Sequence, residues 1–324
     1  MAQAHTAEIG LLLYSGCQMA AVHGMTDLLE TAGAFSRARD GAGIRVSHWG
    51  VGLDGKIVRV YDTHPHEAGG PDMAVVPGRL SGPPDREEAK PYKDWLIEQH
   101  QRGAAIASSC GGAFVLAETG LLDRRAATTH WQFADAFRIR FPDVRLEPDK
   151  IVVDEGDIIT AGGLMAWTDL GLRLIGRVLG PTVATETARF FLVDPSGREQ
   201  RHYGNFSPRL THGDEAILKL QHWLQAKGGR EVTVSDMARE AGLEERTFLR
   251  RFKTATGLKP TEYAQHLRME KARELLQFTK RPVEQISWTV GYEDPAAFRR
   301  IFNRLVGLSP KNYRQRFALE QLTA

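Results

Sequence analysis

The first two thirds of the chain alternate between two hydrophobic patterns. Short apolar runs bounded by glycine or proline are typical of buried strands, and longer stretches with an apolar residue every three or four positions are typical of helices. The short runs predict strands at 9–14, 44–50, 57–61, 73–77 and 104–107, and the longer stretches predict helices at 22–35, 87–102, 111–120, 131–141 and 164–179. This alternation predicts an α/β domain with a doubly wound, mainly parallel sheet covered by helices on both faces.

The last third of the chain has helical periodicity throughout and repeats itself after 50 residues. The pattern Gly-Leu-x-Pro-x-x-Tyr-x-Gln starts at Gly257 and again at Gly307. Further matches are Phe248 with Phe298, Arg250 with Arg300, and Phe252 with Phe302. Two copies are fewer than a solenoid needs, so the repeat predicts a compact, all-helical second domain with two similar lobes.

Each lobe has the pattern of two helices joined by a tight turn. Helices are predicted at 236–240 and 244–254 in the first lobe, at 283–290 and 294–305 in the second, and at 260–278 between them. Gly242 and Gly291 are suited to the left-handed position in the two turns. The second helix of each lobe has phenylalanines on one face and polar side chains on the other, namely Arg246, Thr247, Arg250 and Arg251 in the first lobe and Arg299, Arg300 and Asn303 in the second.

This arrangement predicts double-stranded DNA as a partner. The second helix of a helix-turn-helix unit fits the major groove, where an arginine fork can donate two hydrogen bonds to guanine. Two such helices on a rigid connector would reach successive major-groove faces roughly 34 Å apart. The alternative is that the aromatic stripes are only core and the arginines only solvated surface. The repeat and the glycine turns favour DNA binding.

The distribution of charge supports the same partner. At 324 residues the chain is long enough for about two domains, and its 42% hydrophobic and 25% charged content is ordinary for a globular protein. The formal net charge of +2 divides into a net +6 for residues 213–324 and a net −4 for the remainder. A basic end beside an acidic body favours a polyanion as the partner of that end.

Several classes of protein are disfavoured by composition. No window of about 18 apolar residues predicts a membrane span, and the first residues lack a basic leader, so we expect a cytoplasmic protein. Cys17 and Cys110 are too few for a disulfide framework, which fits a reducing compartment. The histidines and cysteines lack metal-ligand spacing, and Gly162 and Gly163 lack a nucleotide-binding fingerprint, so neither metal nor cofactor is expected.

Cys110 lies in a stretch of small residues between a predicted strand and a predicted helix. The sequence Ala-Ile-Ala-Ser-Ser-Cys-Gly-Gly-Ala is that of a nucleophile elbow with the cysteine at its strained apex. A helix N-terminus at this position is expected to favour the thiolate. His130 could supply a base, or could equally be a core histidine. For Cys110 three roles stay open: catalysis, an inert core residue, or a ligand-pocket residue.

The helical repeat resembles the DNA-binding domain of AraC-type regulators. The stretches ERTFLRRFKTATGLKPTEY and VGYEDPAAFRRIFNRLVGLSPKNYRQRF carry this resemblance, which runs from about residue 211 to 317. It implies that Arg246, Leu249 and Arg250 face base edges in the first lobe, and that Pro295, Ala296, Arg299 and Arg300 face the groove in the second. Pro295 and Ala296 offer only apolar contacts, so the first lobe is expected to discriminate bases more. Arg299 or Arg300 is expected to serve phosphates in part.

The cysteine elbow resembles the ThiJ/PfpI superfamily, which is related to class I glutamine amidotransferases. Val-Val-Pro-Gly ending at Gly78 and Thr-Thr-His-Trp ending at Trp131 complete this resemblance. The whole chain resembles GlxA-type regulators of the AraC family, which fuse this flavodoxin-like domain to an AraC-type domain. The resemblance implies a homodimer controlled by small nitrogenous metabolites such as amino acids or quaternary amines. We expect the effector site to include Gly78, Cys110, Gly111, His130 and Trp131.

The sequence departs from the superfamily's enzymes near the cysteine. Gly111 stands where a histidine commonly follows the cysteine, and Ser108 replaces the first glycine of the elbow. Alignment puts Ala20 or Ala21 at the position of the usual acidic partner, and the nearest carboxylate is Asp27. Because a cysteine nucleophile needs a base and an orienting partner, no catalytic residue is expected. The alternative is a cysteine-dependent hydrolase or amidase that carries a DNA-binding domain.

The sequence also predicts where the domains end. Residues 1–194 are expected to sense the effector and dimerise, 195–212 to form a linker, and 213–324 to bind DNA. Trp131 and Trp167 could offer aromatic faces to a cationic ligand or belong to the core. Our hypothesis is that an effector near Cys110 reshapes the dimer or the linker. The regulator is expected to be an activator, with RNA polymerase as a further candidate partner. A third class, an architectural DNA-binding protein with a purely dimerising body, stays open.

Overall fold

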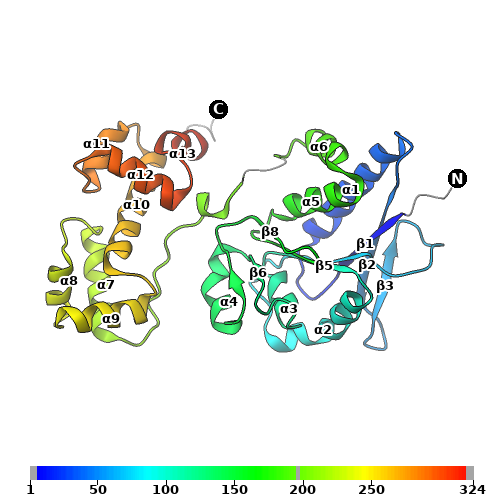
Figure 1. The fold of residues 1–324 in the computed structure, drawn as a ribbon, viewed down its shortest axis with the longest axis horizontal. Coiled ribbons are helices and arrows are strands. Elements are labelled where there is room, and N and C mark those ends of the chain that lie inside the picture. The colour runs from blue at the N-terminus through cyan, green and yellow to red at the C-terminus, as the bar shows by residue number, and fades with distance from the viewer. Residues whose placement is uncertain (1–5, 195–197, 319–324) are drawn as a thin grey trace. The chain divides into compact units, whose positions relative to one another are not determined.

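The chain forms two compact units. The computed structural model describes residues 6–194 and 198–318, and the units comprise residues Met1–Gln200 and Arg201–Ala324. We call them the N-terminal and the C-terminal unit (Figure 1). The division falls within the segment 195–212 that we predicted as a linker, of which residues 195–197 lie outside the described part. Among the described residues, each helix is too short or too polar to cross a bilayer.

The N-terminal unit is built on a seven-stranded sheet with the strand order β3-β2-β1-β4-β5-β9-β8. Its strands are β1 (Ala7–Leu12), β2 (Ile44–Val51), β3 (Ile57–Asp62), β4 (Met73–Val76), β5 (Ala105–Ser109), β8 (Val152–Asp154) and β9 (Ile158–Ala161). The five inner strands are parallel, and the edge strands β3 and β8 are antiparallel to their neighbours. A small second sheet pairs β6 (Ala126–Ala127) with β7 (Arg145–Leu146). The predicted mainly parallel sheet is therefore confirmed.

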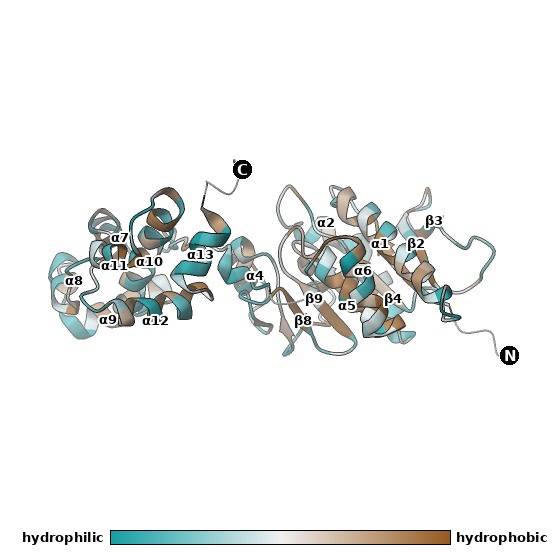
Figure 2. Cartoon of the chain, turned by 90° about the horizontal axis from the view of Figure 1, so that it is seen from above, coloured by the Kyte–Doolittle hydropathy of each residue, from teal (hydrophilic) through white to brown (hydrophobic). Residues whose placement is uncertain are grey.

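Helices cover both faces of this sheet, because its inner strands are apolar on both sides (Figure 1). On one face lie α1 (Met19–Arg37), α5 (Trp167–Leu179) and α6 (Pro181–Phe190), with a core that includes Val22, Leu28 and Ile175. On the other face lie α2 (Arg86–Gln101), α3 (Gly112–Ala117) and α4 (Ala134–Arg140), with a core that includes Leu96, Phe114 and Phe137. The apolar stripes of the helices alternate with hydrophilic residues along each ribbon (Figure 2).

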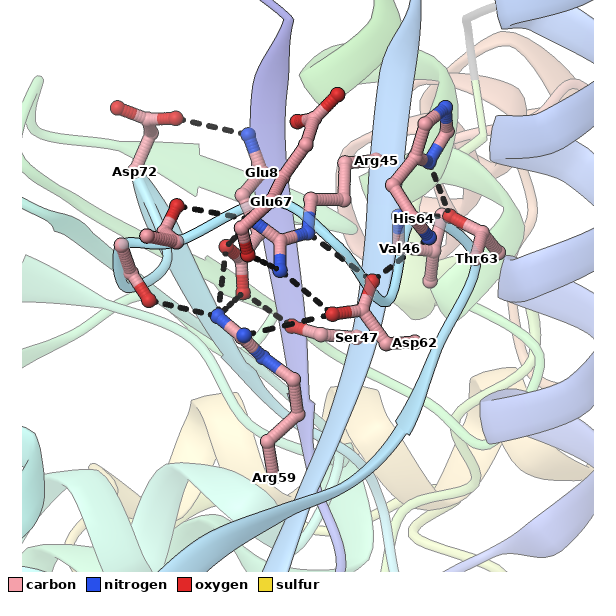
Figure 3. Close-up of polar contacts among 12 residues, drawn as sticks. Glu8, Arg45, Val46, Ser47, Arg59, Asp62, Thr63, His64, Glu67 and Asp72 are labelled. Atoms are coloured by element: carbon pink, nitrogen blue, oxygen red, sulfur yellow. Dashed lines mark hydrogen bonds and ion pairs between the residues drawn. The ribbon is translucent and has the colours of Figure 1, made fainter.

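Buried charges hold the antiparallel edge strand β3 to the parallel part of the sheet (Figure 3). The guanidinium of Arg45 on β2 is only 2% exposed and lies between two carboxylates. Its Nη1 is 3.1 Å from Glu8 Oε2 and its Nη2 is 2.6 Å from Asp62 Oδ2. Arg59 of β3 also pairs with Glu8, at 3.0 Å. Paired and hydrogen-bonded in this way, the charges tolerate burial, and Arg45 lowers the pKa of Asp62 by hydrogen bonding.

The C-terminal unit is all helical and has two lobes, as the repeat predicts. Its helices are α7 (Glu215–Lys227), α8 (Val234–Glu240), α9 (Glu245–Thr256), α10 (Pro260–Phe278), α11 (Val283–Thr289), α12 (Pro295–Val306) and α13 (Pro310–Phe317). Phe248 and Phe252 of α9 are fully buried in the first core, and Phe298 and Phe302 of α12 are fully buried in the second. The long helix α10 contributes residues to both cores.

Candidate functional site

The first candidate DNA-reading surface is the exposed face of α9. Glu244 caps this helix by accepting a hydrogen bond from the backbone N–H of Thr247 at 3.3 Å. Opposite the buried phenylalanines, Arg246 and Arg250 are exposed, and Leu249 is 40% exposed between them. Thr247 is half-buried beside them. Within the described residues, Arg246 and Arg250 have no acidic partner within 4.0 Å, so their donors are available to a ligand.

Not every arginine of α9 is available in this way. The Arg251 side chain, which the sequence pattern grouped with the outward face, binds Asp214 with its Nε at 2.9 Å and its Nη2 at 2.7 Å. Asp214 is also the N-cap of α7 and accepts a hydrogen bond from the backbone N–H of Ile217. The Arg251 guanidinium lowers the pKa of the Asp214 carboxyl by hydrogen bonding. Arg251 therefore fastens α9 to α7, and sequence periodicity did not reveal this role.

In the second lobe, one of the two arginines of α12 that we predicted to face the groove has an acidic partner. Asp294 caps α12 by accepting hydrogen bonds from the backbone N–H groups of Ala296 and Ala297, at 2.8 and 3.0 Å. Arg299 forms an ion pair with Glu284 of α11, which neutralises part of its charge. The remaining predicted residues lie at the same surface, with Ala296, Arg300 and Asn303 exposed and Pro295 half-buried. The roles of these side chains in binding DNA stay predictions.

The cysteine elbow has the strained geometry that the sequence predicts. Strand β5 ends at Ser109, and Cys110 follows with φ = 49°, a left-handed conformation that is rare for a residue other than glycine. The Cys110 backbone N–H donates to Ala161 O at 2.8 Å, which ties the elbow to β9. Helix α3 starts two residues later, at Gly112.

The thiol of Cys110 is protonated and buried, which corrects the expected thiolate. Its side chain is fully buried, and burial raises the thiol pKa to about 11. The backbone N–H groups of Gly111 and Arg79 donate to the sulfur and lower the pKa, but by less than burial raises it. Helix α3 has only six residues, so its dipole is small, and the apolar surroundings dominate.

Gln18, and neither Ala20 nor Ala21, is the side chain that lies beside Gly78 and Cys110. Gln18 is the N-cap of α1, and its backbone N–H donates to Gly78 O at 2.7 Å. A Cβ added at Gly78 would lie 2.9 Å from Cys110 Cβ and 3.4 Å from Gln18 Oε1, so both side chains meet at Gly78. Ala21, one of the two positions predicted, is instead a core residue.

The segment after β6 lies against the backbone of the elbow. Thr129 Oγ1 donates to Cys110 O at 2.8 Å. The imidazole of His130 is half-buried between Trp131 and Phe133, and burial lowers its pKa, which favours the neutral ring. His130 Nδ1 accepts a hydrogen bond from the backbone N–H of Gln132 at 3.2 Å. In the described part of the chain, no hydrogen bond joins this imidazole to the Cys110 thiol, so the two do not form a catalytic pair here.

Gln200, the last residue of the N-terminal unit, is anchored to this same segment. It is 2% exposed. Its Nε2 lies 3.0 Å from Thr128 Oγ1, 2.8 Å from Thr129 O and 2.9 Å from Lys150 O. Its Oε1 accepts a hydrogen bond from the backbone N–H of Trp131 at 3.0 Å. Sequence reasoning missed Gln200, because a glutamine in a polar stretch gives no pattern.

Two further predictions can be compared with the structure. Trp167 packs against Gly24 of α1 and belongs to the core of that face, which is the plainer of its two predicted roles. Within residues 6–194 and 198–318, no three His, Cys, Asp or Glu side chains are grouped as a metal site would require.

Comparison with known families agrees with both units. Residues 19–177 match the family described as "DJ-1/PfpI family", and residues 237–316 match the family described as "Helix-turn-helix domain". The first match spans the elbow, and the second spans most of the two lobes from α8 onward.

Relatives that match about two thirds of this chain are named as transcription regulators. The chain is 29% identical over 221 residues to the HTH-type transcriptional regulator CdhR of Pseudomonas aeruginosa, covering 68% of this chain and 66% of that protein. It is 30% identical over 218 residues to the HTH-type transcriptional regulator GlxA of Rhizobium meliloti, covering 66% of each. It is 28% identical over 227 residues to the HTH-type transcriptional regulator ArgR of Pseudomonas aeruginosa, covering 68% of this chain and 67% of that protein. The matches thus span about two thirds of each relative.

Proposed function

Because this chain belongs to the regulators that join a DJ-1/PfpI domain to an AraC-type helix-turn-helix domain, we propose that it binds an operator and regulates transcription in response to a small nitrogenous metabolite. The observation that carries the proposal is the exposed face of α9, where Arg246 and Arg250 have no acidic partner among the described residues. Free guanidinium groups on the second helix of a helix-turn-helix unit suit the guanine edges of a major groove.

On this proposal the two lobes contribute unequally to base recognition. Arg246, Leu249 and Arg250 of α9 contact base edges, with Thr247 beside them. In α12, Ala296 and Pro295 offer apolar contact to thymine methyl groups. Arg299 shares its charge with Glu284, so it suits a phosphate contact better than a base contact. Arg300 and Asn303 complete that surface.

The effector binds at the elbow of the N-terminal unit, near Gly78, Cys110 and Gly111, with His130 and Trp131 on the adjoining segment. A protonated thiol and an imidazole whose pKa is lowered by burial, with no hydrogen bond between them among the described residues, suit ligand binding better than covalent catalysis. The effector class, amino acids or quaternary amines, rests on the family resemblance. A hydrolase or amidase reaction that Cys110→Ala abolishes would contradict this reading.

Gln200 carries the signal from the effector site to the DNA-binding unit. It is bonded to Thr128, Thr129 and Trp131, which belong to the segment that carries His130. The next residue in the chain, Arg201, accepts a hydrogen bond at its carbonyl from Arg273 of α10, at 2.9 Å, and Gly204 O also accepts from Arg273. An effector that shifts the Thr128–Trp131 segment thus displaces Gln200, and with it the start of the segment that is bonded to α10. The shift needs different effector affinities for two states.

The regulator acts as a cytoplasmic homodimer and activator, with RNA polymerase as a further partner. Dimers of such units read two half-sites related by symmetry, which fits a repeated operator. These parts of the proposal rest on the family resemblance alone.

The test is binding of the purified full-length chain to genomic fragments by fluorescence anisotropy, at low salt and with random-sequence competitor. We expect at least one fragment to bind preferentially, and its affinity to change when amino acids or quaternary amines are added. A chain that binds every fragment like the random competitor, with and without those compounds, would overturn the proposal.

A further inference from the structure

The strongest unexplained feature of the N-terminal unit is a buried oxygen without a hydrogen-bond donor. Gln18 is 6% exposed, and its Oε1 has no hydrogen-bond partner within the described residues. An acceptor buried without a donor destabilises a folded protein, because it has lost the hydrogen bonds that water gave it. Such a group therefore needs an explanation, and it lies beside the proposed effector site.

The backbone of Gln18 is fixed, but its side chain is not used to hold the fold. The backbone N–H donates to Gly78 O at 2.7 Å, and the Gln18 carbonyl accepts from Ala21 at 2.9 Å at the start of α1. The side chain makes no capping hydrogen bond. It is directed instead toward Gly78 and Cys110, where the missing Cβ of Gly78 leaves room between the two side chains.

Several of the neighbouring donors are already committed elsewhere. The Tyr14 hydroxyl donates to Pro77 O at 2.8 Å. Both terminal nitrogens of Arg79 donate to the Glu88 carboxylate at 2.7 Å. The backbone N–H groups of Arg79 and Gly111 donate to the Cys110 sulfur. The site thus combines a free acceptor with a neutral thiol, and an added group that donates a hydrogen bond would complete it.

We propose that Gln18 selects the effector by accepting a hydrogen bond from an N–H group of that molecule. The ligand class is therefore a primary amine, ammonium or amide that carries N–H, as in an unmodified amino acid, and not a quaternary amine, which has no N–H to donate. Met19 and Leu80, which adjoin the site in sequence, are 47% and 72% exposed and offer apolar contact to the rest of the ligand. This inference rests on the proposed function and narrows its ligand class.

The first test needs no ligand and compares two buried glutamines of the same unit. In the full-length chain, Gln18→Met removes the unpaired acceptor with little change of volume, and we expect the melting temperature of the N-terminal unit to stay level or rise by a few degrees. The matched variant Gln200→Met removes a glutamine with all its hydrogen bonds made and is expected to lower the melting temperature. If Gln18→Met lowered the melting temperature as much as Gln200→Met does, Gln18 would have a structural role and the inference would be overturned.

The second test measures selectivity by isothermal titration calorimetry with pairs of compounds that differ only in N-methylation. The pairs are glycine with glycine betaine, ethanolamine with choline, and L-lysine with its trimethylated form. In each pair that binds, we expect the compound with N–H groups to bind at least about tenfold tighter than its N-methylated counterpart. The reason is that a site built to accept a hydrogen bond rejects an analogue that cannot donate one. In Gln18→Met this gap should fall to less than about threefold.

The outcomes separate this inference from the proposed function. Equal or tighter binding of the trimethylated compounds, or a gap that persists in Gln18→Met, would overturn the role of Gln18 and leave an effector-controlled regulator intact. A gap that persists in Gln18→Met is also the result expected if a bound water molecule, and not the ligand, donates the hydrogen bond to Gln18 Oε1. If none of the six compounds bound the wild-type chain, the nitrogenous effector class would fail and the inference would fail with it.

Discussion

The backbone and the side chain of Cys110 have different roles. Its left-handed backbone, at φ = 49°, turns the chain from β5 toward α3, while its thiol lies in the interior with a pKa raised to about 11 by burial. A thiol with that pKa is a poor nucleophile at neutral pH, because only the thiolate reacts. The elbow geometry alone therefore does not make this cysteine reactive.

The raised pKa predicts slow alkylation of Cys110. At pH 8 about one thiol in a thousand would be ionised, so iodoacetamide should modify folded Cys110 far more slowly than it modifies the urea-unfolded chain. Using Cys17→Ser removes the other, half-buried thiol from the measurement. Mass spectrometry over a pH series should show the rate rising toward pH 11. Rapid, complete modification at pH 7 would contradict a protonated, buried thiol.

A second prediction at this scale concerns Arg250. Because its guanidinium is exposed on α9 without an acidic partner in the described chain, Arg250→Ala should weaken operator binding by about 1–3 kcal/mol and relax base preference. Arg239→Ala on α8 is the matched control, since Arg239 pairs with Asp236 away from the recognition helix. Competition assays with operator variants measure both. Equal losses in the two variants would mean a general effect of charge and not base reading.

The residues of the site differ in how far the sequence predicted them. The spacing of small residues around Cys110 predicted the elbow, because a strand-turn-helix apex demands small neighbours. It could not predict the protonation state, which depends on side chains brought in by other strands. Gln18 and Gln200 also escaped prediction, since a single polar residue acquires its role only from the buried partners that folding supplies.

At the scale of elements, the sequence predicted helices and strands well where a long periodic pattern began or ended at a residue typical of a helix or strand end. Helix α10 was predicted at its observed bounds, because Pro260 suits the first turn and the amphipathic pattern spans five turns. Strands β8 and β9 and helix α6 were missed. The strands are three and four residues long, too short for a period. Helix α6 begins at Pro181 directly after Gly180, where we expected the preceding helix to end and predicted no further helix.

The edge strand β3 depends on charges as well as on sheet hydrogen bonds. Asp62→Asn would leave the buried Arg45 guanidinium with one carboxylate fewer, and we expect a loss of roughly 3 kcal/mol in the free energy of unfolding of the N-terminal unit. Asp54→Asn, in the exposed turn between β2 and β3, is the control and should change stability by less than about 0.5 kcal/mol. Urea denaturation measures both.

The same pair predicts a direction for acid sensitivity. The pKa of Asp62 is lowered in the folded chain by its hydrogen bond to Arg45, so the unfolded chain takes up this proton first as the pH falls. The stabilisation is therefore present above the unfolded pKa of about 3.9 and is lost as the pH falls below it. The wild-type chain should lose more stability between pH 5 and pH 3 than Asp62→Asn does. Parallel acid profiles for the two chains would count against this assignment.

At the scale of the whole molecule, two independently packed units are joined through consecutive anchored residues. Gln200 is bonded within the N-terminal unit, and the Arg201 carbonyl is bonded to α10 within the C-terminal unit. If an effector moved Gln200, a connection of this kind would transmit the displacement along the backbone to Arg201. The sequence predicted only a polar interdomain linker, because its composition carries no sign of the contacts that Gln200 and Arg201 make.

The hydrogen bonds of Gln200 can be removed by substitutions in the N-terminal unit, which leave the DNA-binding unit unchanged. A Cβ added at Gly162 would overlap Gln200 Nε2 and would lie 2.7 Å from Thr129 O, so Gly162→Ala should expel the Gln200 side chain. Gln200→Ala removes the same hydrogen bonds from the other side. Both variants should still bind operator and should still bind whichever amine alters operator affinity in the wild-type chain. In both variants, adding that amine should change operator affinity little or not at all. The effector site and the DNA-binding surface are no longer coupled once the hydrogen bonds of Gln200 that connect them are lost.

Gly176→Ala supplies the control, since its added Cβ would make an ordinary 3.7 Å contact with Ala184 in the same unit. Amide hydrogen exchange of residues 198–204 should quicken in Gly162→Ala and Gln200→Ala and stay at the wild-type rate in Gly176→Ala, because only the first two lose buried hydrogen bonds. If exchange quickened as expected while operator affinity still responded fully to the amine, the signal would have to travel by a route other than Gln200, such as a rearrangement of the dimer. A full response together with unchanged exchange would mean instead that the Gln200 side chain had not been displaced, and the double variant would then decide the question.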